Sequence, residues 1–189
     1  MRVITGSARG RRLRELEGMD TRPTTDRVKE GLFSALQFDI EGRRVLDLFA
    51  GTGQLGIECL SRGAASAVFV DQRPRALQVI RENLRLTGLE AGASVVSGEA
   101  LAYLAACRET FDLIFLDPPY RTGLLEQALE AIGGRGLLRR HGILAAEHPA
   151  ECPPPSPEGL KCLRRTYRYG KIGLTVFRDT EEEEKERDP

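Results

Sequence analysis

One short stretch of the sequence combines residue types that could do chemistry on a bound molecule: Asp-Pro-Pro-Tyr at residues 117–120. It directly follows the apolar run Leu-Ile-Phe-Leu at 113–116, which is typical of a buried strand. Proline fixes the backbone and removes an amide donor, so the turn presents a carboxylate and an aromatic ring on a stiff support. Open α/β sheets bind ligands at the carboxyl ends of their strands, and the turn is therefore a predicted ligand site.

The turn offers two hydrogen-bond acceptors and an aromatic face, which an exocyclic amine of a nucleobase and its ring could use. Such an amine is a poor nucleophile because its lone pair is delocalised into the ring, and acceptors on its two protons favour the pyramidal geometry of attack. Asp117 and the carbonyl of Pro118 can be those acceptors, with Pro118 and Pro119 holding both in place. Tyr120 offers a face for base stacking, worth about 1 to 3 kcal/mol. A rigid turn without a ligand is the structural alternative.

A glycine-rich turn, Gly-Thr-Gly at 51–53, lies between an apolar strand pattern and a helical pattern. Gly51 and Gly53 let the backbone approach a ligand at a helix N-terminus, although the wider G-x-G-x-x-G match also fits a dinucleotide site or a plain turn. Asp47 would repel a diphosphate and attract an ammonium, so it favours S-adenosylmethionine over a nicotinamide dinucleotide. Asp71, at the end of the next strand, can accept hydrogen bonds from both ribose hydroxyls, or it can be a surface acid.

Further cofactor candidates follow the third predicted strand. Glu99 and Ala100 could border an adenine ring, although an N-terminal position in the next helix explains Glu99 equally well. With the neighbours of the glycine turn and of Asp71, the predicted cofactor-binding set is Asp47, Phe49, Ala50, Gly51, Thr52, Gly53, Asp71, Gln72, Glu99 and Ala100. The four cysteines and two histidines lack zinc-site spacing, so we expect no metal and no cysteine or serine nucleophile paired with histidine.

Alternating strand and helix patterns must position these residues. The strand patterns are apolar on both faces and alternate with helical patterns, which predicts an α/β fold with a mostly parallel sheet and helices on both faces. They read RRVLDLF, SAVFVD, ASVVSG, FDLIFLD and GILAAEH. The segment KCLRRTYRYGKIGLTVFRD predicts an antiparallel hairpin at the sheet edge. At the start, RVITGSARGRRLREL predicts a small β-hairpin, and TRPTTDRVKEGLFSALQFDI a helix.

The 189 residues suit one domain with two additions: an N-terminal extension at 1–40, a main domain at 41–178 and an acidic tail at 179–189, which we expect to be disordered. The net charge is zero, but residues 1–14 hold five arginines and no acid, and residues 161–178 hold six basic residues and no acid. This distribution suits a polyanionic partner or simply a solvated surface. The nucleic-acid candidates are Arg9, Arg11, Arg12, Arg14, Arg22, Thr24 and Arg27.

No apolar run approaches the roughly 18 to 20 residues that span a bilayer, and the first residues lack the apolar core of a signal peptide. We therefore expect a cytoplasmic protein without a membrane partner.

The quoted motifs resemble those of known methyltransferases. DLFAGTGQLGIE is similar to the first motif of class I S-adenosylmethionine-dependent methyltransferases, which have a Rossmann-like fold. DPPY is similar to the fourth motif of those that methylate exocyclic amines of bases. With GSARGRRL, TRPTTDRVKEGLF, SRGA and YRYGKIGL, the sequence resembles the bacterial RsmD family over nearly all of residues 1–178. It departs modestly from that pattern, because Asp71 stands where many relatives carry Glu and Glu99 where Asp is commoner.

This resemblance implies S-adenosylmethionine-dependent methylation of the N2 amine of a guanine in 16S ribosomal RNA, free or within an assembling 30S particle, by a monomer. DPPY alone does not select the base, since the same residues occur in enzymes that methylate adenine N6 or cytosine N4. Methylation of adenine N6 in DNA or RNA and a non-catalytic RNA-binding role in assembly are the alternatives.

Overall fold

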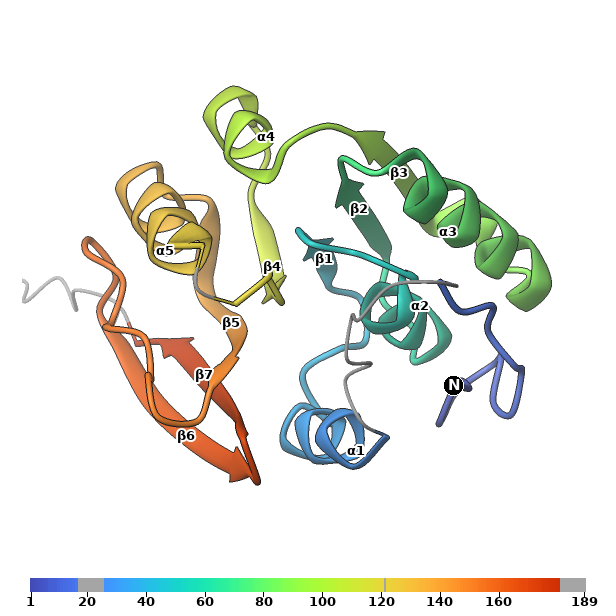
Figure 1. The fold of residues 1–189 in the computed structure, drawn as a ribbon, viewed down its shortest axis with the longest axis horizontal. Helices are drawn as coiled ribbons and strands as arrows, with labels where there is room; N and C mark the ends of the chain where they lie inside the picture. The colour runs from blue at the N-terminus through green and yellow to red at the C-terminus, as the bar shows by residue number, and fades with distance from the viewer. Residues whose placement is uncertain (17–25, 121, 181–189) are drawn as a thin grey trace, which may run out of the picture.

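Seven strands form a single sheet in the part of the chain that the computed structural model describes, residues 1–16, 26–120 and 122–180 (Figure 1). Their order across the sheet is β3-β2-β1-β4-β5-β7-β6, with parallel pairing from β3 to β5 and antiparallel pairing of β7 with β5 and β6. The strands are β1 (Arg44–Asp47), β2 (Ser66–Asp71), β3 (Ala93–Ser97), β4 (Phe111–Leu116), β5 (Leu138–Pro149), β6 (Cys162–Tyr169) and β7 (Ile172–Asp179). The predicted parallel sheet and antiparallel edge hairpin are confirmed.

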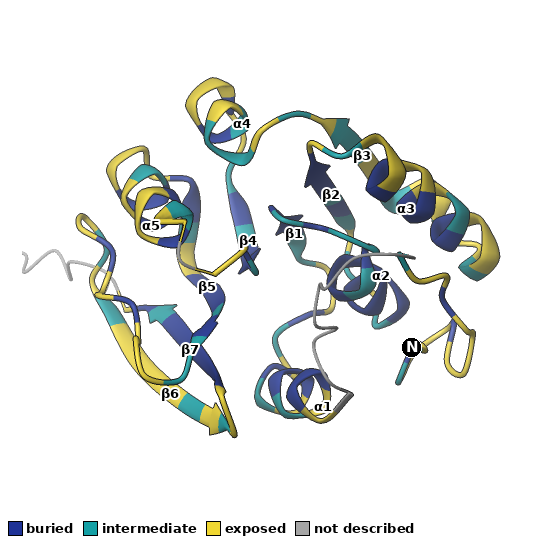
Figure 2. Cartoon of the chain, viewed as in Figure 1, coloured by how far each residue is buried: buried dark blue, intermediate teal, exposed yellow. Residues whose placement is uncertain are grey.

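Helices cover both faces of the sheet, as predicted. One face carries α1 (Asp26–Ala35), α2 (Gln54–Ser61) and α3 (Pro74–Thr87), and the other carries α4 (Ala100–Ala106) and α5 (Leu124–Gly134); a short 3-10 helix, η1 (Glu90–Gly92), precedes β3. Figure 2 shows the buried residues of α3 and α5 on their sheet-facing sides. Each face has its own apolar core, and alternate residues of the central strands point into one core or the other.

The chain winds outward from β1 to β2 and β3, then crosses back to place β4 on the other side of β1. The strand order therefore reverses between β1 and β4, which is where open α/β sheets form a crevice at the carboxyl ends of their strands. Both motifs singled out in the sequence follow the strands at this point: the glycine turn comes after β1 and Asp-Pro-Pro-Tyr after β4.

In place of the predicted N-terminal hairpin, the segment folds back on itself and forms a single antiparallel β-bridge, between Arg2 and Arg12. Its apolar residues Val3, Ala8 and Leu13 join the core on the α2 face, so the segment packs as part of the sheet's cover. The predicted helix over 21–40 has its described part in α1, which ends at Ala35. The division into a 1–40 extension, a 41–178 domain and a disordered tail stays a prediction. Asp179, which was predicted to belong to the tail, is the last residue of β7, and residues 181–189 lie outside the described residues.

Candidate active site and nucleic-acid interface

Four acidic side chains lie at the carboxyl ends of four neighbouring strands. In spatial order they are Asp71 at the end of β2, Asp47 at the end of β1, Asp117 directly after β4 and Glu147 near the end of β5. Leu116 pairs with Ala146 in the register of β4 and β5, so Asp117 and Glu147 each follow by one residue. A cavity of about 870 Å³ opens at this edge of the sheet, within the size range of small-ligand sites.

Most residues predicted from the sequence line this cavity. All four catalytic candidates do so, and the cofactor candidates that line it are Phe49, Gly51, Thr52, Asp71, Gln72, Glu99 and Ala100. Three cofactor candidates are not in its lining: Asp47, Ala50 and Gly53. The sequence interpretation missed the lining residues Met1, Glu15, Leu16, Leu48, Gln54, Arg73, Gly98, Leu101, Leu124 and Glu147.

The glycine turn requires glycine for two different reasons. Gly51 (φ 56°) and Gly53 (φ 77°) both have left-handed backbones, which side chains rarely adopt. A Cβ on Gly53 would also press at 3.3 Å on Ile57 and Ile80, because this residue packs α2 against α3. Gly51 instead borders the cavity, where no atom would come closer to its Cβ than 3.9 Å, so its backbone is open to a ligand.

Asp47 lies beneath the turn and does not open into the cavity. Its side chain is 2% exposed, and its Oδ2 accepts a hydrogen bond of 3.0 Å from the amide of Gly56 in the first turn of α2. Burial raises the pKa of Asp47 to about 7; the Gly56 bond opposes this and the charge of Asp71 adds to it. Asp47 can act on a ligand through its electric field, and direct contact requires the turn to shift.

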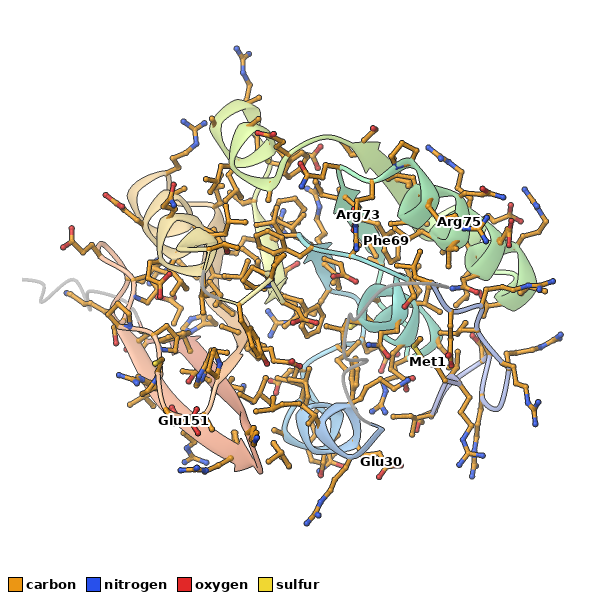
Figure 3. All side chains as sticks on the ribbon, in the orientation of Figure 1. Met1, Glu30, Phe69, Arg73, Arg75 and Glu151 are labelled. Carbon is orange, nitrogen blue, oxygen red and sulfur yellow. The ribbon has the colours of Figure 1, made fainter. Side chains whose placement is uncertain are left out.

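Asp71 is held by both oxygens. Oδ2 accepts a bond of 3.0 Å from the Gly51 amide, and the guanidinium of Arg73 donates to Oδ1 at 3.0 Å and to Oδ2 at 2.8 Å. Figure 3 labels Arg73, which follows the carboxyl end of β2. The hydrogen bond to Asp71 raises the pKa of Arg73, so the guanidinium stays charged. A ribose hydroxyl that bonds Asp71 must share the carboxylate with Arg73 or displace it.

The Asp-Pro-Pro-Tyr turn carries its side chains into the same cavity. Asp117 is half-buried and Pro118 is buried, whereas Pro119 and Tyr120 are exposed. The Tyr120 hydroxyl donates a hydrogen bond of 2.9 Å to Oε1 of Glu147, which ties the aromatic residue to β5. A rigid acceptor and an accessible ring therefore face the cavity from one turn, as stacking and amine recognition require.

The arginine-rich N-terminal segment adjoins the cavity through Met1, Glu15 and Leu16, which form part of its wall. Its arginine side chains are exposed and none of them lines the cavity; the predicted ones are Arg9, Arg11, Arg12 and Arg14. In Figure 3, nitrogen-tipped side chains radiate outward from this segment. Arg27 is exposed at the start of α1, while Arg22 and Thr24 lie outside the described residues.

Buried polar side chains hold this segment on α2. Glu58 has no exposed side-chain area; its oxygens accept bonds from the amides of Ile4 at 2.7 Å and Thr5 at 3.0 Å, and from Nε of Arg62 at 2.9 Å. The equally buried ammonium of Lys29 lies 3.9 Å from Glu58 and donates to the carbonyl of Arg2 at 2.6 Å. The arginines thus project from a fixed backbone.

Within the described residues, no helix is long and apolar enough to cross a membrane, and no group of three or more His, Cys, Asp or Glu side chains could hold a metal ion. All four cysteines are free thiols.

The reversed strand order, the antiparallel β7 and the glycine turn over a row of strand-end acids define a class I methyltransferase. A solved structure titled "Putative methyltransferase yhhF from Escherichia coli" superimposes with a TM-score of 0.85 at 34% identity, covering 96% of this chain and 99% of that one. The chain belongs to the family described as Conserved hypothetical protein 95, whose model matches residues 1–178.

Curated relatives match along nearly the whole chain. "Putative rRNA methyltransferase YlbH" of Bacillus subtilis (strain 168) is 42% identical over 94% of this chain and 98% of its own length. "Ribosomal RNA small subunit methyltransferase D" of Escherichia coli (strain K12) is 34% identical over 100% of this chain and 94% of its own length.

Proposed function

We propose that this protein transfers the methyl group of S-adenosylmethionine to the N2 amine of a guanine in 16S ribosomal RNA. The observation that carries the proposal is that Gly51 and Thr52 of the glycine turn, Asp71 and residues 117–120 all border one cavity at the reversal of strand order. Relatives named as ribosomal RNA methyltransferases, the small-subunit one included, support the choice of substrate. The choice of guanine N2 as the methylated atom is the most specific part of the proposal.

The cavity fits the cofactor in size and in chemistry. When bound, S-adenosylmethionine supplies an electrophilic methyl group on a sulfonium. Asp71 would accept the ribose hydroxyls, the backbone around Gly51 and Thr52 would contact the amino-acid part, and Asp47 would favour its ammonium through the field at the turn. Glu99 and Ala100, at the start of α4, would border the adenine.

The turn after β4 would orient the target base. The Tyr120 ring stacks on the base, while Asp117 and the Pro118 carbonyl accept the two N2 protons and favour the pyramidal nitrogen. The amine nitrogen would take the methyl group as the bond from carbon to sulfur breaks, S-adenosylhomocysteine would be released, and the methylated nitrogen would then lose one proton to solvent. This mechanism needs neither a covalent enzyme adduct nor a strong general base.

The exposed arginines of residues 9–14 would contact phosphates and position the RNA over the cavity. We propose that the enzyme acts as a monomer in the cytoplasm, where ribosomal subunits assemble. Free 16S RNA and an assembling 30S particle are both candidate substrate forms.

The deciding experiment measures methyl transfer from labelled S-adenosylmethionine to 16S RNA, free and in 30S particles that lack the modification, with nucleoside analysis of the product. We expect N2-methylguanosine at one position. Methyladenosine would refute the base, and absence of product despite tight cofactor binding would refute the enzyme assignment. The variant D117A should lose turnover and keep its cofactor affinity, since Asp117 is assigned to the base.

A further inference from the structure

Glu147 is the one acidic residue of β5 and lies near the carboxyl end of the strand. The preceding residues Ile143 to Ala146 are all buried, and His148 after it is 1% exposed. Glu147 nevertheless lines the cavity, half-buried, at the carboxyl edge of the sheet. Its place is the β5 counterpart of Asp117 after β4, because Ala146 and Leu116 are paired in register.

Glu147 is also bonded to the predicted stacking residue. The Tyr120 hydroxyl donates to Oε1 of Glu147 at 2.9 Å, which orients both side chains toward the same part of the cavity. A carboxylate offers about four lone-pair sites, so this bond is compatible with a second hydrogen bond from a ligand. Neighbouring strands lie about 4.8 Å apart, and Asp117 and Glu147 follow paired residues of β4 and β5 and line one cavity together with Tyr120.

We infer that Glu147 selects guanine by accepting a hydrogen bond from N1–H while Asp117 accepts one from the adjacent N2 amine. The inference rests on the proposed function and deepens it. A base taken out of its helix is read by hydrogen bonds to its Watson–Crick edge. Guanine presents two neighbouring donors there, N1–H and the N2 amine, which match two neighbouring acidic acceptors.

The same pair of carboxylates rejects the other amine-bearing bases. Adenine carries a lone pair on N1 beside its N6 amine, and cytosine carries one on N3 beside its N4 amine. With either base bound through its amine at Asp117, a lone pair would face the Glu147 carboxylate, and the two acceptors would repel each other. Glu147 therefore supplies the base selection that Asp-Pro-Pro-Tyr alone lacks.

The test replaces the target guanine by 2-aminopurine, which keeps the 2-amine and has a lone pair at N1. RNA joined from fragments, with either base at the target position, is assayed for kcat/KM in the substrate form on which the wild type is active. The wild type should prefer guanine by at least about 100-fold, because a site built to bond a substrate N–H rejects an analogue without it.

The variant Glu147→Gln should lose roughly tenfold or more on guanine and gain on 2-aminopurine, since its amide can donate to N1. The preference for guanine should fall below about tenfold. Tyr120→Phe is the matched control: it removes the hydroxyl and keeps the ring and the carboxylate, so most of the preference should remain. Glu147→Ala should lose the preference without the gain on 2-aminopurine. Cofactor affinity, measured by calorimetry, should be unchanged in all three.

Three results distinguish the possible failures. If the wild type forms N2-methylguanosine and both Glu147 variants keep the full preference for guanine over 2-aminopurine, the inference is wrong and the proposed function stands. If the wild type forms methyladenosine instead, the proposed function itself fails. Equal losses on both bases in the Glu147 variants would assign the residue a purely structural role and also overturn the inference.

Discussion

Replacing Asp47 with Asn should make the protein more stable and a worse cofactor binder. The carboxyl is 2% exposed and its pKa is raised from 3.8 to about 7. Because the pKa of Asp47 is higher in the folded protein than in the unfolded chain, its contribution to stability is fully present below the pKa of the unfolded chain. That contribution is lost as the pH rises through the pKa of the folded protein. Three pH units at roughly 1.4 kcal/mol each give a cost of about 4 kcal/mol at pH 8. An Asn oxygen can still accept the Gly56 hydrogen bond, so the variant escapes this cost.

The same substitution should lower the affinity for the cofactor. An ammonium at about 6 Å from the ionised carboxylate gains roughly 3 kcal/mol at an effective dielectric constant near 20, which corresponds to about 100-fold in affinity. Asp47 binds a proton below pH 7, so wild-type affinity should rise between pH 5.5 and pH 7 by up to tenfold per unit. The Asn variant should bind weakly over this whole range.

Urea unfolding without cofactor, at pH 5 and pH 8, measures the first effect, and calorimetry with S-adenosylmethionine across the pH range measures the second. Asp112→Asn is a suitable control, because Asp112 lies at the other end of β4 and is 3.3 Å from Arg139 and 3.8 Å from Arg43. That variant should lose stability and keep cofactor affinity. Wild-type cofactor affinity in Asp47→Asn would show that Asp47 only anchors α2, and lower stability at pH 8 would refute the burial argument.

Three further outcomes follow from the same structure. Glu58→Gln removes a buried charge from beside Lys29 and should cost about 3 to 5 kcal/mol in urea unfolding, and limited proteolysis should show a loosened N-terminal segment; an intact segment would contradict this. Burial lowers the pKa of His148, so the unfolded chain takes up the proton first and stability should fall as the pH drops below 6.5. His148→Phe should flatten that decline in pH-dependent unfolding. The double variant R9A/R11A should weaken RNA binding and reduce the slope of log K against log salt by about 1.4 to 1.8, with unchanged cofactor affinity; an unchanged slope would exclude phosphate contacts.

The sequence was most informative where a local pattern alone determines structure. Apolar strands alternating with helical patterns predicted the sheet, and the glycine turn and Asp-Pro-Pro-Tyr followed β1 and β4 as expected. Glu147 was missed because it follows four apolar residues inside a strand pattern that continues past it. The sequence did contain a pattern that could have identified Glu147, because it is the fourth acidic residue at the end of an apolar strand pattern, after Asp47, Asp71 and Asp117.

Other residues needed the tertiary structure. Arg73 contacts Asp71 through a turn whose direction the sequence does not fix, and Met1 and Leu16 reach the cavity only because the N-terminal segment folds over α2. The burial of Asp47 also depends on how closely α2 packs under the turn, so the prediction of direct ligand contact stays a prediction.

Asn83 joins the arginine-rich segment to the cofactor turn. Fully buried in α3, its side chain accepts a bond of 2.6 Å from the Arg14 amide and donates to the carbonyls of Arg14 at 3.1 Å and Thr52 at 2.9 Å. Breaking any of these bonds would leave a buried polar group without a hydrogen-bond partner, which is costly. The backbones at Arg14 and Thr52 therefore keep a fixed separation. The arginines therefore have a set position relative to the glycine turn before RNA arrives. Such preorganisation lets phosphate contacts far from the reacting nitrogen place the base beside the methyl donor.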